Sequence, residues 1–164
     1  MGEEISSEEF PAEFVWFEVV EIGEPAANAL RIVVAESIAR ELQTEIVAPG
    51  VQITAHPMTV GEDSRIFEIL WDYCVSYMVT NESYCFPEKG KPIGGGAISE
   101  WQISEYLSFV RSSTFAEAIR DKVIRHWRLA TQNHIVDVAA FEPPQIRRLA
   151  PSEIPKFDSG NTGH

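Results

Sequence analysis

The sequence predicts an α+β domain: a mainly antiparallel sheet of about five strands with helices packed on it. Three observations lead to this prediction. Short segments rich in β-branched and aromatic residues recur along the chain, most connections between them are too short for parallel crossovers, and two later segments carry helix-capping signals. The expected order is β-α-β-β-β-α-α-β. With 164 residues, 45% of them apolar, the chain is long enough to bury a sizeable core.

One domain is expected over residues 13–149. Residues 1–12 are acidic, contain Pro11 and show no hydrophobic periodicity, so we expect a mobile acidic arm there. Residues 150–164 contain two each of Pro, Gly and Ser, which is typical of a disordered tail.

The first half of the domain contains one ambiguous segment. Residues 13–22 are rich in aromatic and β-branched residues and predict a strand. Residues 25–47 then place apolar side chains on one helical face, with Pro25 suited to a first turn, and predict a helix. If Pro25 belongs to a loop instead, this segment divides into a strand and a shorter helix.

Three strands are expected next, over residues 51–57, 65–71 and 74–81. Only Asp72 and Tyr73 separate the last two, which predicts a tight hairpin. Both faces of these two strands are fairly apolar, so we expect helices to cover the sheet on at least one side.

The last part of the domain combines a loop, two helices and a final strand segment. Residues 86–98 have loop composition. Ser99 with Gln102, and Thr114 with Glu117, predict two capped helices, the second ending near residue 124. Residues 126–141 form either one bulged strand or two strands joined by a turn, and Pro143-Pro144 ends this segment.

The charge distribution is the strongest indication of function. The net charge is −12, and residues 1–64 hold 13 acids against two bases. Direct nucleic-acid binding would require clustered Lys and Arg, so a basic protein partner fits better. We therefore expect a non-enzymatic protein-binding module, with an inhibitor or immunity-type protein as one version. Its candidate partner-binding residues are Glu13, Glu18, Glu21, Glu24, Glu36, Glu41 and Glu45. The competing interpretation is that this charge serves only solubility.

A polar cluster at the end of the expected strand 74–81 is the alternative site. Asn81, Glu82, Tyr84 and Cys85 stand where a strand passes into a loop, a common place for functional groups. They would belong to a small enzyme or ligand-binding domain whose pocket also uses the 86–98 loop. The competing interpretation is that the polar side chains only bond the local backbone and close the strand.

Two histidines complete the set of candidate residues. His126 and His134 flank the polar middle of the last strand segment, and Asp137 lies nearby. The spacing matches no metal motif, so we expect no metal and no cofactor, and structural roles for both histidines.

Compartment and assembly follow from general features. The N-terminus lacks a signal-peptide pattern, no apolar run is long enough to span a bilayer, and there are two cysteines, so we expect a cytoplasmic protein that does not bind membranes. An uncovered sheet edge would allow a homodimer.

Overall fold

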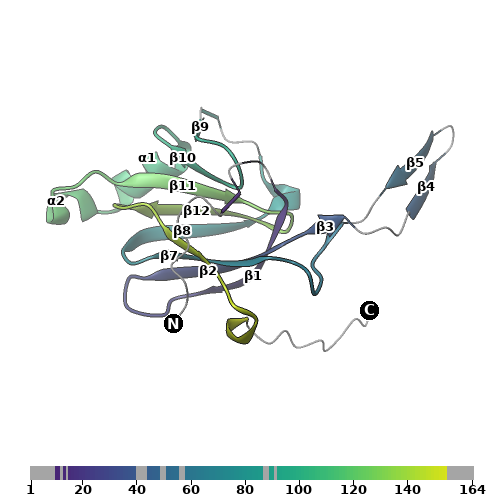
Figure 1. The fold of residues 1–164 in the computed structure, drawn as a ribbon. Coiled ribbons are helices and arrows are strands. Elements are labelled where there is room, and N and C mark those ends of the chain that lie inside the picture. The colour runs from purple at the N-terminus through teal and green to yellow at the C-terminus, as the bar shows by residue number, and fades with distance from the viewer. Residues whose placement is uncertain are drawn as a thin grey trace.

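Two antiparallel sheets packed face to face form the body of the computed structural model (Figure 1). The structure describes residues 10, 11, 13, 15–39, 44–48, 51–55, 58–86, 89, 90 and 92–154. One sheet has the strand order β1 (Phe17–Gly23), β2 (Leu30–Glu36), β7 (Ile66–Trp71) and β13 (Gln145–Arg148). The other has the order β8 (Cys74–Asn81), β12 (His134–Ala140), β11 (Arg125–Ala130), β10 (Ile98–Trp101) and β9 (Pro92–Ile93).

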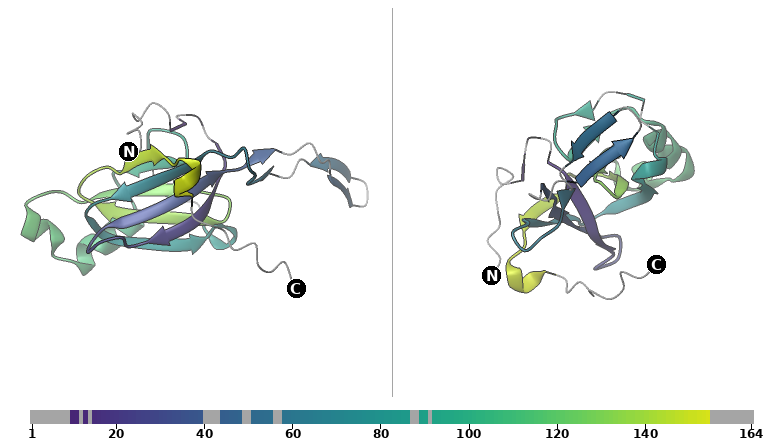
Figure 2. Two further views of the ribbon diagram at one scale, coloured as in Figure 1. Left: turned by 60° about the horizontal axis from the view of Figure 1, so that its bottom comes forward. Right: turned by 90° about the vertical axis from the view of Figure 1, so that its right-hand side faces the viewer.

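Two short ribbons continue from the first sheet. Strand β3 (Ile38–Ala39) pairs with β6 (Met58–Thr59), and β4 (Thr44–Ala48) pairs with β5 (Val51–Ala55). The β4–β5 ribbon projects beyond the two sheets, at the end opposite the helices (Figures 1 and 2).

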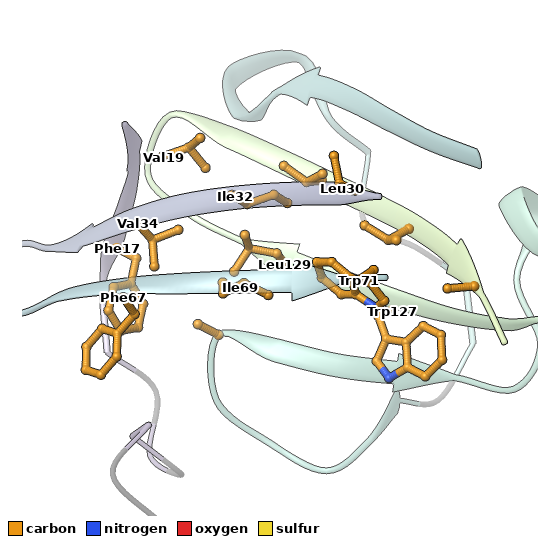
Figure 3. Packing of buried hydrophobic residues seen from close by; sticks show 14 residues of the cluster. Phe17, Val19, Leu30, Ile32, Val34, Phe67, Ile69, Trp71, Trp127 and Leu129 are labelled. Atoms are coloured by element: carbon orange, nitrogen blue, oxygen red, sulfur yellow. The ribbon is translucent and has the colours of Figure 1, made fainter. Parts of the chain in front are cut away.

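The main hydrophobic core fills the space between the two sheets. Strands β1, β2 and β7 supply Phe17, Ile32 and Ile69, and the facing sheet supplies Trp127 and Leu129 (Figure 3). The alternation of side chains along each strand produces this core, because every second residue points to the same face. Each large apolar side chain that is fully buried here contributes roughly 1.5–3 kcal/mol to folding.

The helices lie on the outer face of the five-stranded sheet. Helix α1 (Glu105–Ser113) buries Tyr106, Leu107 and Val110 against Ala139 of β12 and its neighbours. Helix α2 (Ala116–Arg120) follows directly. Single-turn 3₁₀ helices η1 (Glu82–Tyr84) and η2 (Pro151–Glu153) follow β8 and β13.

The predicted class is confirmed in its general form, because the fold is mostly antiparallel sheet with few helices. Strands are present in the predicted segments 13–22, 51–57, 65–71 and 74–81. The predicted element order is only loosely matched, since the structure divides the strands between two large sheets and two ribbons.

The helix predicted over residues 25–47 is wrong. This segment contains β2, β3 and β4, and within it residues 40–43 lie outside the described part. Strand β2 is a central strand covered on both faces, so Ile32, Val33, Val34 and Ala35 are all buried. Such a strand loses its polar–apolar alternation and imitates a helical pattern. The alternative prediction for this segment, a strand followed by a shorter helix, is right about the strand and wrong about the helix.

The hairpin predicted at Asp72-Tyr73 is also wrong. Strand β7 pairs with β2 and β13, whereas β8 pairs with β12 in the opposite sheet. Facing sheets lie only about 10 Å apart, so two residues are enough to carry the chain from one to the other. The two sheets cover one face of each other, and helix α1 packs on the outer face of the sheet that contains β8, where Val75 and Ser76 contact the α1 side.

The predicted helix starts need correction. Ser99 lies in β10, where its Oγ accepts a hydrogen bond from Trp101 Nε1, and the first helix is capped by Ser104 instead. Thr114 ends α1 rather than capping α2, and Glu117 Oε1 accepts from the backbone N–H of Ile124. The segment 86–98, expected to be a loop, includes the short strand β9.

The C-terminal part follows the second of the two alternatives for residues 126–141. Strands β11 and β12 form a hairpin whose turn is held by Thr131, since its Oγ1 donates to His134 O at 2.6 Å. Strand β13, beyond Pro143-Pro144, was not predicted.

The predictions for the chain ends fall mainly outside the described residues. Residues 1–9, 12 and 155–164 are among those that the structure does not describe, so the mobile arm and disordered tail remain predictions. Phe10 is described, and its ring stacks on Phe17 at 5.3 Å between centroids.

Candidate binding edge between strands β1 and β8

Strands β1 and β8 are linked at one side of the sandwich by the side chain and backbone of Asn133. Asn133 Oδ1 accepts from the backbone N–H of Val19, and its Nδ2 donates to the Val19 carbonyl, both at 2.9 Å. The Asn133 carbonyl accepts from Glu82 N at 3.3 Å. This residue of the β11–β12 turn therefore connects the middle of β1 to the end of β8. We call residues 17–29 and 74–86 the β1–β8 edge.

A second connection joins the opposite end of this edge. The backbone N–H of Cys74 donates to Asn28 O at 2.6 Å, and the Tyr77 hydroxyl donates to Glu24 Oε1 at 3.1 Å. Asn28 has a φ of 64°, a left-handed conformation that asparagine tolerates better than most residues. The hydrogen bond to the Glu24 carboxylate favours the protonated phenol and raises the pKa of Tyr77.

Large apolar side chains of β8 and the segment after it are exposed at this edge. Tyr77, Met78 and Val79 are 37%, 43% and 41% exposed. Beyond the strand, Tyr84 and Phe86 are 83% and 90% exposed. A cluster of this kind at the rim of a sheet is typical of an interaction site.

The charges at the β1–β8 edge are all negative. Its two segments contain Glu18, Glu21, Glu24 and Glu82 and no Lys or Arg. Glu21 is paired with Arg31, whereas Glu24 and Glu82 are exposed and Glu18 is partly exposed. The edge therefore combines exposed apolar side chains with unbalanced negative charge.

The other predicted partner-binding acids have different surroundings. Glu36 forms a two-point pair with Arg65, with both N–O distances at 2.8 Å, and the hydrogen bond from Arg65 holds the pKa of Glu36 below its usual value. Glu13 is exposed just before β1. Glu41 lies outside the described residues, and Glu45 lies in β4, where only the backbone is described.

A ladder of ion pairs crosses the outer face of the four-stranded sheet. Arg31 contacts Glu21 and Glu68, and Arg147 contacts Glu68 and Glu153. Burial of Glu68 alone would raise its pKa, but the hydrogen bonds and charges of the two arginines outweigh this effect and lower it. Glu21 therefore contributes to the fold of its own sheet.

The polar cluster at the end of β8 is organised around the backbone. Asn81 Oδ1 accepts from Ser83 N at 3.0 Å and caps η1, the structural role that we considered as the alternative. Glu82 and Tyr84 extend into solvent, and the Cys85 thiol donates to Phe86 O at 3.5 Å. Within the cluster, only Asn81 is held by a side-chain contact that fixes the turn.

The two predicted histidines lie at opposite ends of the β11–β12 pair. His134 is opposite Asn81 of β8, and its Nδ1 is buried without a hydrogen-bond partner among the described residues. His126 is opposite Ala139 and fully buried. The structure therefore places His134 beside the polar cluster and His126 away from it.

A buried hydrogen-bond network surrounds His126, and the sequence did not predict it. Ser104 Oγ lies 2.8 Å from His126 Nδ1, and His126 Nε2 lies 2.8 Å from Asp137 Oδ1. Arg128 adds two hydrogen bonds to the Asp137 carboxylate. Asp137 and Arg128 are direct cross-strand partners, a relationship that becomes visible only once the register is known.

Burial decides what this Ser–His–Asp arrangement can do. Ser104, His126 and Asp137 are 3%, 0% and 1% exposed, so a substrate cannot reach the serine hydroxyl. Ser104 Oγ also accepts from the backbone N–H of Leu107 as the cap of α1. The network therefore connects the start of α1 to the two central strands beneath it, and we assign it a structural role.

A cavity of about 350 Å³ lies near the other end of β8. Tyr73, Arg120 and Phe141 line it, and the Arg120 guanidinium lies 4.0 Å from the centre of the Tyr73 ring. The neighbouring Cys74 thiol lines a smaller cavity, and burial raises its pKa to about 12. Within the described part of the chain, no cluster of three metal-ligating side chains is found.

Among the described residues, no helix has the length and apolar character needed to cross a membrane. Comparison of the chain with protein-family models, with curated proteins and with solved structures found no match.

Proposed function

We propose that this protein is a non-enzymatic protein-binding module that engages a basic partner through the β1–β8 edge. The observation that carries this proposal is the combination of exposed Tyr77, Met78 and Val79 with Glu24 and Glu82 on an edge that contains no base. Apolar side chains supply contact area, and negative charge selects a positive partner.

The overall charge supports the same proposal. A net charge of −12 attracts a basic protein over distances of about a Debye length, roughly 8 Å at physiological salt, and so increases the association rate. Because Glu21 and Glu36 are paired with arginines of their own sheet, the acids that bind the partner are Glu18, Glu24 and Glu82. The two free cysteines suit the cytosol, and an inhibitor or immunity-type protein is one form that such a module takes.

The test is a low-salt pull-down from lysate of the source organism, eluted with a salt gradient. A basic protein captured by the wild type is then titrated against the triple variant E18Q/E24Q/E82Q. We expect the triple variant to bind at least tenfold more weakly at low salt, because each lost charge removes part of the attraction. The difference should shrink as salt screens the remaining charge.

A control variant distinguishes the effect of the acids at the β1–β8 edge from the effect of the net charge of the protein. The variant E62Q/D63N/D121N removes three exposed acids that lie outside the two segments of the β1–β8 edge and reduces the net negative charge by the same amount. It should bind the partner nearly as well as the wild type. If both variants lose affinity equally, or if neither does, the β1–β8 edge is not the binding surface.

The cavity beside Arg120 favours a second function, small-ligand binding. This cavity lies at the Cys74 end of β8, whereas the pocket that we expected from the sequence lies at Asn81–Cys85, at the other end of the strand. The cavity lining combines aromatic walls with Arg120 and Lys122 and also includes Asp72 and Glu142. The ligand that we propose is a small aromatic carboxylate held by the Arg120 guanidinium. A thermal-shift titration with benzoate and indole-3-acetate tests it: the melting temperature should rise for the wild type and not for R120Q.

A further inference from the structure

Three of the four edge strands of the two large sheets are protected against further pairing. Strand β9 has only two residues, and a bulge between Val19 and Glu21 interrupts β1. Strand β13 follows Pro143-Pro144 and ends in Arg147 and Arg148. Short length, bulges, prolines and charges are the usual devices that keep a sheet edge from pairing with another chain.

Strand β8 lacks most of these devices. It has eight residues, from Cys74 to Asn81, with no proline and no charged side chain. Its pairing irregularity is confined to the end near Cys74, which leaves the run from Ser76 to Asn81 regular. Within the described part of the chain, β8 pairs as a strand with β12 alone, and on its other side the backbone contact from Cys74 to Asn28 lies at the Cys74 end, outside the run from Ser76 to Asn81.

The register identifies which main-chain groups of β8 point outward. Glu82 N donates to Asn133 O, and these residues continue the pairing in which His134 lies opposite Asn81. In an antiparallel pair, hydrogen-bonded and non-bonded positions alternate. The N–H and C=O groups of Tyr77, Val79 and Asn81 therefore point away from β12, ready to pair with a further strand.

We propose that an extended segment of a basic partner adds to β8 as the next antiparallel or parallel strand of the five-stranded sheet. This inference rests on the proposed function, since it specifies how the basic partner is held at the same edge. The outward groups of Tyr77, Val79 and Asn81 supply main-chain hydrogen bonds, which give affinity without depending on sequence.

Side chains determine which segment fits. Tyr77 and Val79 lie on one face of β8 and Met78 and Thr80 on the other, and the first three are partly exposed. Apolar residues of the added strand would pack against them. Glu24 and Glu82 lie near the two ends of this run and place the Lys or Arg residues of the partner there. The fitting partner segment is therefore extended and alternates basic with apolar residues.

Amide hydrogen exchange on the wild-type protein tests the proposal directly. The probe is a short peptide in which lysine alternates with valine. We expect the amides of Tyr77, Val79 and Asn81 to exchange quickly in the free protein and at least tenfold more slowly with peptide bound. A peptide of equal charge with prolines in place of the valines cannot donate from those positions and should give little protection.

Two substitutions at one position provide a matched pair. Val79→Pro removes one outward N–H and leaves the ladder to β12 intact, because proline is tolerated on the open side of an edge strand. Val79→Ala retains the N–H and loses only side-chain contact. We expect Val79→Pro to weaken peptide binding about tenfold, the effect of one main-chain hydrogen bond, and Val79→Ala to have a smaller effect.

The outcomes distinguish this inference from the proposed function. Salt-dependent peptide binding that leaves the three amides unprotected contradicts strand addition and leaves the proposed function standing. Partner binding that is unchanged in E18Q/E24Q/E82Q contradicts the proposed function, because that variant removes the charges and leaves the outward main-chain groups of β8 in place. If the three amides are protected without peptide and sedimentation shows a dimer, a second copy of the chain occupies β8 and the inference is wrong.

Discussion

His126 and Asp137 form a hydrogen bond of 2.8 Å between Nε2 and Oδ1 in the interior of the protein. Because a carboxylate only accepts hydrogen bonds, Nε2 carries the hydrogen, and in the neutral imidazole Nδ1 then accepts from the Ser104 hydroxyl. Arg128 neutralises the carboxylate, because its Nε donates to the same Oδ1 and its Nη2 donates to Oδ2. Asp137 therefore holds two strands and the start of α1 together.

Replacing Asp137 with asparagine should destabilise the fold strongly. The variant removes the negative charge that compensates Arg128 and changes the acceptor of His126, and breaking a buried pair of this kind costs about 3–5 kcal/mol. Urea unfolding followed by circular dichroism measures the change. A loss below about 1 kcal/mol would show that the network contributes little. As a comparison, E62Q removes an exposed carboxylate before β7 and should have a much smaller effect.

Replacing Ser104 with alanine should cost about 1–3 kcal/mol. The variant loses the cap of α1, which receives Leu107 N at 2.9 Å, and leaves His126 Nδ1 buried without its partner. Ser112 on the same helix is an exposed control, and S112A should change the free energy of unfolding by less than about 0.5 kcal/mol. Equal effects at the two serines would contradict the structural role assigned to Ser104.

Low pH should lower the free energy of unfolding, because it protonates Asp137. Burial alone would raise its pKa, but the hydrogen bonds from His126 and Arg128 outweigh this, so the pKa in the folded state lies below its ordinary value of 3.8. A lowered carboxyl pKa contributes stability that is present above about pH 4 and is lost as the pH falls through the folded-state pKa. Urea unfolding between about pH 5 and pH 2 should show this loss. The D137N variant should lose less stability over that range, and an unchanged slope would contradict the assignment.

The two cysteines should react with thiol reagents at different rates. Burial raises the pKa of Cys74 to about 12, so almost no thiolate is present there at neutral pH. Cys85 follows the exposed turn η1. Iodoacetamide labelling followed by mass spectrometry should therefore modify Cys85 first. Labelling of the C85S variant should be slow, and that of C74S fast. Faster labelling of Cys74 than of Cys85 would contradict the burial of the Cys74 thiol.

Several features of this protein follow from short-range sequence patterns. Strands β7 and β8 were predicted because β-branched and aromatic residues stand between turn residues, and these preferences act locally. The unequal charge is a property of composition, so the acidic edge could be anticipated in outline. The predicted polar turn at Asn81 also depends on neighbours within two residues.

Other features were decided by contacts between distant segments. Whether residues 30–36 form a helix or a strand depended on β1 and β7, which pair with β2 along its two edges. The sheet that β8 joins depended on β12, more than fifty residues later in the chain. Local preference is weak compared with the burial of a complete strand, so tertiary packing overrides it.

The candidate site shows the same division. The sequence by itself determined that Glu18, Glu24 and Glu82 are acidic and that Tyr77, Met78 and Val79 form a strand. Only the tertiary structure decided that these residues share one edge, because Asn133 brings β1 and β8 together. It also decided that Glu21 and Glu36 pair with arginines and that His126 is buried with Asp137. Those pairings require a register and a sheet order, which arise when many weak long-range contacts form together.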